Sequence, residues 1–201
     1  VLTGNAGANV LYGGAGIDIM IGGAGDDSYV VDVSTDVITE LAGGGIDSVS
    51  SAVTYTLSAN VENLTLTSNI AINGTGNASD NVLTGNSGAN VLLGGEGNDT
   101  YNGGAGVDTL TDSSTTSNDV YKWGAGQGND VITDAGGTDR IDIAGAYTTS
   151  QIKLTKSTND LKISITGVTD VLTIKNYYLS TANRVETIRL DNGSTITLGT
   201  A

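Results

Sequence analysis

The sequence predicts an all-β fold, a parallel β-roll (β-solenoid) with a β-rich C-terminal cap. Three observations predict this fold. A nine-residue glycine-rich pattern recurs in frame, position eight of every copy is apolar or tyrosine, and the chain after Asp142 changes to longer alternating strands. A three-residue strand cannot bury a core by itself, so repeats of this kind are stable only when successive turns stack.

The nine-residue period is clearest in seven copies. The first three, GNAGANVLY, GGAGIDIMI and GGAGDDSYV, begin at Gly4, Gly13 and Gly22. The same frame returns in GNASDNVLT, GNSGANVLL, GGEGNDTYN and GGAGVDTLT, which begin at Gly76, Gly85, Gly94 and Gly103. Position six carries a side-chain oxygen in every copy, at Asn9, Asp18, Asp27, Asn81, Asn90, Asp99 and Asp108. Position eight is the predicted core residue, at Leu11, Met20, Tyr29, Leu83, Leu92, Tyr101 and Leu110.

The composition of each copy indicates a tight turn followed by a short strand. Glycine tolerates positive φ and lets backbone carbonyls approach a ligand closely. If one nonapeptide is one turn and one strand, two make a full coil, and position six stacks on position six of the next copy but one. Carboxylates would then lie about 4.8 Å apart along each edge and would repel each other unless a divalent cation lay between them.

The composition of the whole chain excludes several other kinds of site. There is no Cys or His, which excludes thiolate and imidazole chemistry, disulfides and ordinary zinc sites. The net charge of −14 argues against nucleic acid and anionic lipid as partners, although an acidic surface also has a purely solubilising role. No apolar stretch is long enough for a membrane span and no signal peptide is visible, and the start at Val1 suggests a fragment.

The segment 28–75 has few glycine turns but many strand-forming residues, and it is predicted to continue the solenoid with longer strands and weaker cation sites. VLTGNAGANVL at Val1 and VLTGNSGANVL at Val82 are 81 residues apart, which is nine periods. Aspartates continue through the segment at Asp36 and Asp47. The predicted division is a roll over 1–112 and a cap over 113–201.

The C-terminal part begins at the Ser/Thr-rich stretch 111–119. The series of position-six acids, called the ladder below, does not stop there but becomes less regular, and it continues at Asp119, Asp130 and Asp139. QIKLTK, DLKISIT, DVLTIKNYY, VETIRLD and STITL then predict a β-rich cap that carries most of the Lys and Arg residues. Covering the open end of the solenoid is its expected role.

The repeat resembles the nonapeptide G-G-x-G-x-D-x-U-x of RTX proteins, which binds calcium in a parallel β-roll. DLKISITGVTDVLTIKNYY and VETIRLDNGSTITL resemble the region that follows the repeats in haemolysin-type calcium-binding proteins. Carboxylate and carbonyl oxygens in a flexible cage also suit Ca²⁺ better than the smaller Mg²⁺. The resemblance implies a secreted, extracellular bacterial protein, exported by a type I secretion machinery, with a cap that starts folding of the roll.

The resemblance also implies which residues bind the ions. Backbone carbonyls of positions one and three and the position-six side chain of one turn face carbonyls two and four and position six of the next turn on that edge. The implied sites are Gly4, Ala6 and Asn9 with Gly23, Gly25 and Asp27; Gly76, Ala78 and Asn81 with Gly95, Gly97 and Asp99; and Gly85, Ser87 and Asn90 with Gly104, Gly106 and Asp108. Asn in place of Asp is expected to weaken each of them. Further acidic ligands are expected in the pairs Asp18 with Asp36 and Asp27 with Asp47, and at Asp119, Asp130 and Asp139.

Two functions stay open at this point. The first is a module that folds when it binds extracellular calcium. The second is an adhesin domain that binds polysaccharide or a surface, with calcium only structural. Trp123 with Tyr121, and Tyr177 with Tyr178, fit either sugar stacking or the core of the cap, and the latter is favoured. No enzyme activity is expected, because the carboxylates recur at every turn instead of forming one catalytic pair.

Overall fold

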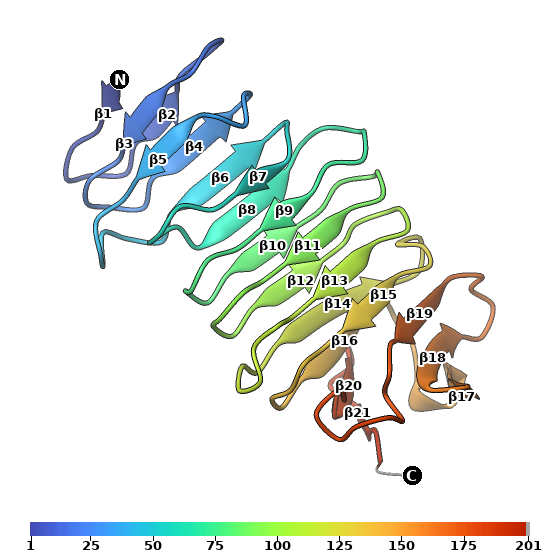
Figure 1. Ribbon diagram of the computed structural model, residues 1–201. Coiled ribbons are helices and arrows are strands. Elements are labelled where there is room, and N and C mark those ends of the chain that lie inside the picture. The colour runs from blue at the N-terminus through green and yellow to red at the C-terminus, as the bar shows by residue number, and fades with distance from the viewer. Residues whose placement is uncertain (200–201) are drawn as a thin grey trace.

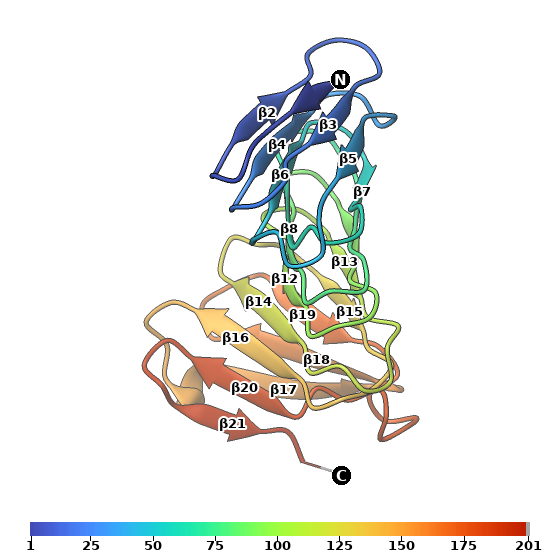
Figure 2. The same cartoon turned by 90° about the vertical axis from the view of Figure 1, so that its left-hand side faces the viewer.

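A computed structural model describes residues 1–199 as an elongated all-β structure, with the two termini at opposite ends of its long axis (Figures 1 and 2). Its one helical element within that range is the 3₁₀ turn η1 (Thr149–Gln151). No helix among these residues is long and apolar enough to cross a bilayer. The predicted parallel β-roll with a β-rich cap is confirmed.

One face of the roll is a single ten-stranded sheet, in the order β2-β4-β6-β8-β10-β12-β14-β16-β20-β21. Its strands are β2 (Val10–Tyr12), β4 (Ser28–Val31), β6 (Ser48–Ser51), β8 (Asn63–Leu66), β10 (Val82–Thr84), β12 (Thr100–Asn102), β14 (Val120–Gly124), β16 (Arg140–Ala144), β20 (Thr187–Leu190) and β21 (Thr195–Thr197). All neighbours are parallel except β20 and β21. The sheet runs on past residue 112 without interruption.

The opposite face is made of two sheets. Three strands form β1-β3-β5, and eight form the order β17-β18-β19-β15-β13-β11-β9-β7. Their bounds are β1 (Leu2–Thr3), β3 (Ile19–Ile21), β5 (Val37–Thr39), β7 (Tyr55–Thr56), β9 (Gly74–Thr75), β11 (Val91–Leu93), β13 (Thr109–Thr111), β15 (Val131–Thr133), β17 (Ile152–Ser157), β18 (Asp160–Ile165) and β19 (Val171–Ile174).

The strand register confirms that each repeat stacks on the next copy but one. Leu83 lies opposite Tyr101, and Leu92 opposite Leu110, an offset of two nonapeptides in both cases. Where the repeats are irregular, the offset changes while the stacking continues. Val49 pairs with Leu64 after 15 residues, because the turn between β6 and β7 is shorter than a regular turn.

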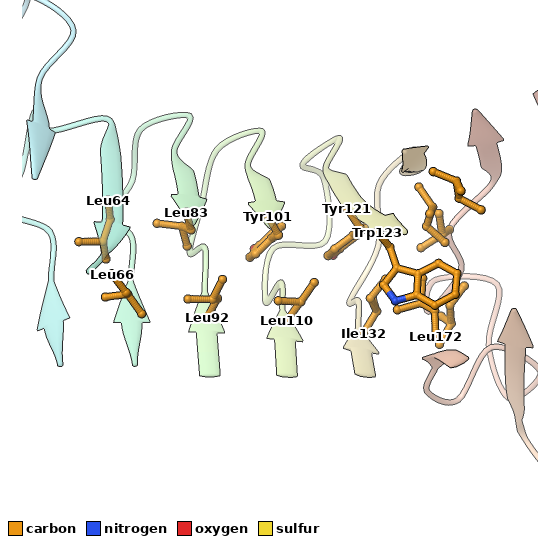
Figure 3. Close-up of a cluster of buried hydrophobic side chains, with 14 of the residues drawn as sticks. Leu64, Leu66, Leu83, Leu92, Tyr101, Leu110, Tyr121, Trp123, Ile132 and Leu172 are labelled. Carbon is orange, nitrogen blue, oxygen red and sulfur yellow. The ribbon is translucent and has the colours of Figure 1, made fainter. Parts of the chain in front are cut away.

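The core is a double row of side chains along the axis of the roll. Leu64, Leu83, Tyr101 and Tyr121 from the ten-stranded sheet face Leu92, Leu110 and Ile132 from the opposite face (Figure 3). All seven position-eight residues of the regular repeats are buried, as predicted. Each regular coil therefore contributes only two core side chains, one from each strand, and depends on its neighbours for stability.

The segment 28–75 forms β4 to β9 and lies in the same sheets as the regular repeats. It keeps inward-facing residues such as Val31, Val49 and Leu66, which are at most 2% exposed. Alternation of β-branched and Ser/Thr residues gives strands here with few glycine turns, as the sequence predicts.

The two ends of the roll differ. At the C-terminal end, β17, β18 and β19 are antiparallel, and β21 closes the ten-stranded sheet. Trp123, Tyr121 and Tyr177 are at most 2% exposed, so they pack in the core and offer no sugar-stacking face. At the N-terminal end, β1 and β2 have no further coil above them in this chain, and Val10 is 79% exposed.

Candidate metal centre

Two edges of the roll carry the position-six residues. The turns that lead into the ten-stranded sheet form the first edge, and those that lead into β3, β5, β11, β13, β15 and β19 form the second edge. On both edges the backbone N–H of position six donates to a carboxylate oxygen, Oδ1, one coil further on, as from Asp99 to Asp119 at 2.7 Å. The other bonds of this kind join Asn9 to Asp27, Asp18 to Asp36, Asp27 to Asp47, Asn81 to Asp99, Asn90 to Asp108, Asp108 to Asp130 and Asp119 to Asp139, at 2.7–3.0 Å.

The second carboxylate oxygen, Oδ2, is left without a partner in most of these residues. It is buried and accepts no hydrogen bond in Asp27, Asp47, Asp99, Asp108 and Asp139. Within residues 1–199 the ion pairs are Arg140 and Arg189 with Asp142 and Lys175 with Asp160, so no basic side chain neutralises the ladder. Buried carboxylate oxygens without a donor are the arrangement that a cation satisfies.

Burial also changes the protonation of these acids. It raises the pKa of Asp108 to about 6 and that of Asp99 to about 7, with neighbouring carboxylates adding to the effect at Asp99. At Asp139 burial together with nearby acids raises the pKa to about 8. A divalent cation would act in the opposite direction, because it favours the charged form of every carboxylate that it contacts.

Glycine permits the close stacking of the turns. Gly97 has φ +98°, and a Cβ built there would lie 2.7 Å from the carbonyl carbon of Ser79 in the coil below. Gly106 has φ +139° and stands over Gly88 in the same way. The backbones of successive turns therefore approach as closely as shared carbonyl ligation requires.

The carbonyl ligands that the resemblance implies all lie in these turns. Gly4, Ala6, Gly23, Gly25, Gly76, Ala78, Gly95 and Gly97 are on the first edge, and Gly85, Ser87, Gly104 and Gly106 are on the second. Their role as ligands stays a prediction, as does that of the side chains with them.

The asparagines at position six make bonds that an aspartate could not. The Oδ1 of Asn81 accepts the N–H of Asn77 at 2.7 Å, and its Nδ2 donates to the carbonyls of Val61 and Glu62. Asn90 accepts from Asn86 and donates to the carbonyl of Ile72. Both side chains thus connect a glycine turn to an irregular coil before it, which explains why the amide replaces the carboxylate there.

Three further acids join the ladder on the first edge. Glu40, Asp112 and Asp134 each follow a strand directly, at position one, where a regular repeat has glycine. Each comes together with two position-six residues in a three-acid cluster whose ligand oxygens all lie within 4.8 Å of one another. The clusters are Asp27–Glu40–Asp47, Asp99–Asp112–Asp119 and Asp119–Asp134–Asp139. The nonapeptide pattern did not predict these three acids as ligands, although an acid in the glycine position was a visible signal.

Comparison with known families agrees with this geometry. The RTX calcium-binding nonapeptide repeat matches residues 1–38, 75–110 and 125–142. The chain belongs to the RTX nonapeptide-repeat family. The haemolysin-type calcium binding protein related domain matches residues 160–200, in the cap. A search of curated proteins gave no match. The RTX repeats identify the cation as Ca²⁺, as predicted, and the chain is a calcium-binding β-roll module.

Proposed function

We propose that this RTX module is a calcium-dependent folding unit of a type I secreted bacterial protein, largely disordered at the low calcium concentration of the cytosol and folded outside the cell. The buried, unpartnered Oδ2 atoms of the position-six ladder carry this proposal. They make the folded state unfavourable without a cation and favourable with one.

The distribution of charge supports the same conclusion. All eight basic residues lie at or after Lys122, where they equal the acidic residues in number, so the whole net charge of −14 belongs to residues 1–119. That part of the roll has a thin core, with two buried apolar side chains in each regular coil, and no basic residue of its own. Bound calcium ions are the positive charges that would offset this repulsion.

The cap has a separate role in this proposal. It covers the C-terminal end of both faces with β17 to β21, while the N-terminal end stays open to further coils. A covered end provides a surface on which the next coil stacks, so folding that starts there extends one coil at a time.

Circular dichroism of the chain at neutral pH, in excess chelator and then with added calcium, tests the proposal. We expect a disordered spectrum that changes to β-sheet over a narrow range of calcium concentration, and magnesium at the same concentration should not replace calcium. A β-sheet spectrum in chelator that calcium does not alter would refute calcium-dependent folding.

A further inference from the structure

Two positions correlate in residue type along the chain. One is the buried residue of a strand in the ten-stranded sheet, and the other is the first residue of the next turn on the first edge. Where the turn starts with glycine, the strand carries leucine; where it starts with an acid, the strand carries tyrosine. The leucine pairs are Leu11–Gly22, Leu64–Gly76 and Leu83–Gly94, and the tyrosine pairs are Tyr29–Glu40, Tyr101–Asp112 and Tyr121–Asp134. Val49, followed by Leu57, and Ile141, followed by Lys175, have neither combination.

The structure shows why tyrosine and acid occur together. The hydroxyl of Tyr121 donates to Asp134 at 2.8 Å, and that of Tyr29 donates to Glu40. The hydroxyl of Tyr101 donates to the carbonyl of Thr111, directly before Asp112. A buried hydroxyl needs a polar partner, so each tyrosine holds the start of the turn against the interior of the roll.

The position-one acids are as deeply enclosed as the position-six ladder. Asp112 is 1% exposed, Asp134 2% and Glu40 7%. The Oδ2 of Asp112 is one of the buried oxygens that accept no hydrogen bond. The same holds for the Oδ2 of Asp99 in its own cluster and for the Oδ2 of Asp139 in the cluster of Asp134. A solvated acidic surface does not have these properties, since water would satisfy its oxygens.

We propose that Glu40, Asp112 and Asp134 are calcium ligands of a second kind, which add a third carboxylate to the sites of Asp27–Asp47, Asp99–Asp119 and Asp119–Asp139. This inference rests on the proposed calcium dependence and names the sites that dominate it. Oxygens bound to one Ca²⁺ at 2.3–2.6 Å lie at most about 5 Å apart, which the 4.8 Å limit of each cluster satisfies.

The charge of these clusters makes them the tightest sites of the chain. A regular site such as Asn90–Asp108 offers one carboxylate at position six, whereas each cluster offers three. Affinity rises with the number of charged ligands. Two of the clusters share Asp119, so the sites of Asp112 and Asp134 lie in adjacent coils beside the cap, and loss of one should weaken the other.

Calorimetric titration of the full chain with calcium tests the assignment, with Asp112→Asn as the variant and Asp80→Asn as the matched control. Asn keeps the Oδ1 that Asp112 offers to the N–H of Ser114 and that Asp80 offers to the N–H of Asn98. Both variants remove one charge from the same region of the roll, but Asp80 is exposed and belongs to no cluster. We expect Asp112→Asn to lose one tightly bound ion or to weaken the tightest class about tenfold or more, and Asp80→Asn to change it by less than about threefold.

Terbium luminescence excited through tyrosine gives an independent measurement, because Tb³⁺ takes the same oxygen ligands and the clusters lie next to Tyr101 and Tyr121. Asp112→Asn should reduce the part of the terbium luminescence that is lost first when calcium is added and replaces Tb³⁺. If Asp112→Asn does not fold in saturating calcium, the double variant Tyr101→Leu with Asp112→Gly restores the leucine–glycine pair of the regular coils. That double variant should fold and should bind the ion of the Asp99–Asp119 site about tenfold or more weakly than the wild type, because two carboxylates remain there in place of three.

The outcomes separate this inference from the proposed function. A wild type that folds on calcium binding, with Asp112→Asn no weaker than Asp80→Asn, would overturn the third-carboxylate sites alone. A double variant that binds the tightest class of ions as strongly as the wild type would do the same. A wild type that binds calcium tightly without any change in its β-sheet content would instead refute calcium-dependent folding and leave the site assignment standing.

Discussion

Replacing Gly97 by alanine should show how much the close stacking of the turns contributes to stability. Gly97 is at position four of its repeat with φ +98°, a left-handed conformation that costs an alanine about 1–2 kcal/mol. The added Cβ would also meet three backbone atoms of the coil below: the carbonyl oxygen of Ser79 at 2.5 Å, its carbonyl carbon at 2.7 Å and the amide nitrogen of Asp80 at 2.9 Å. Backbone atoms cannot rotate away, so overpacking adds about 1–3 kcal/mol.

Gly126 is the matched control for this substitution. It has φ +85° and lies in a stacked turn between β14 and β15, but a Cβ there meets nothing within 4 Å. Gly126→Ala should therefore cost only the conformational term of about 1–2 kcal/mol, against about 2–5 kcal/mol for Gly97→Ala. Both variants share the same gain from a less flexible unfolded chain, which cancels in the comparison.

Urea unfolding in saturating calcium, followed by circular dichroism, measures both free energies of unfolding. A calcium titration of each variant adds a second readout, since Gly97→Ala separates two turns that are predicted to share an ion. Equal losses of stability in the two variants would show that the contact between the turn backbones is not tight in solution. The account of the glycines as spacers would then be wrong.

Two further predictions concern the ladder. In a calcium titration followed by circular dichroism, Asp108→Ala should shift the transition to higher calcium concentration and reduce its cooperativity, because it removes the only carboxylate of its predicted site beside the cap. Asn9→Ala, in the uncovered first coil, should have much less effect. Equal shifts in the two variants would mean that the coils fold independently. In chelator, the β-sheet content should be highest at acidic pH and should fall as the pH rises through about 7 and 8, the raised pKa values of Asp99 and Asp139. The reason is that the folded chain still holds protons at these carboxylates, which the unfolded chain releases near its ordinary pKa of 3.8. A constant spectrum between pH 5 and 9 would contradict this prediction.

The sequence was sufficient for the parts of the fold that follow a strict period. Position eight becomes the core because a three-residue strand between two turns has one inward side chain, and Leu92 on Leu110 is the register that two nonapeptides dictate. The pairing of Asp27 with Asp47 was also predictable, because an acid again follows a glycine turn there, although the full nonapeptide pattern is missing.

The three-acid clusters were not predictable from the period alone. The turns 40–47 and 112–119 are two residues longer than a regular turn, so the frame no longer says which coil an acid faces. Only the register of the folded strands shows that Asp112 meets both Asp99 and Asp119. The role of the asparagines was hidden for the same reason, because the carbonyls that Asn81 reaches belong to an irregular coil.

The same residues oppose and direct the folding of this module. Asp99, Asp119 and Asp139 bury carboxylates at successive coils, which burial alone makes unfavourable. Their Oδ1 atoms nevertheless accept the backbone N–H of the coil before, so the ladder fixes the register of the stack, while the Oδ2 atoms of Asp99 and Asp139 accept no hydrogen bond. A leucine at position six would remove the repulsion and also the register bond. The roll therefore combines specificity of stacking with dependence on an ion in one side chain, through the Oδ1 and the Oδ2 of the same carboxylate.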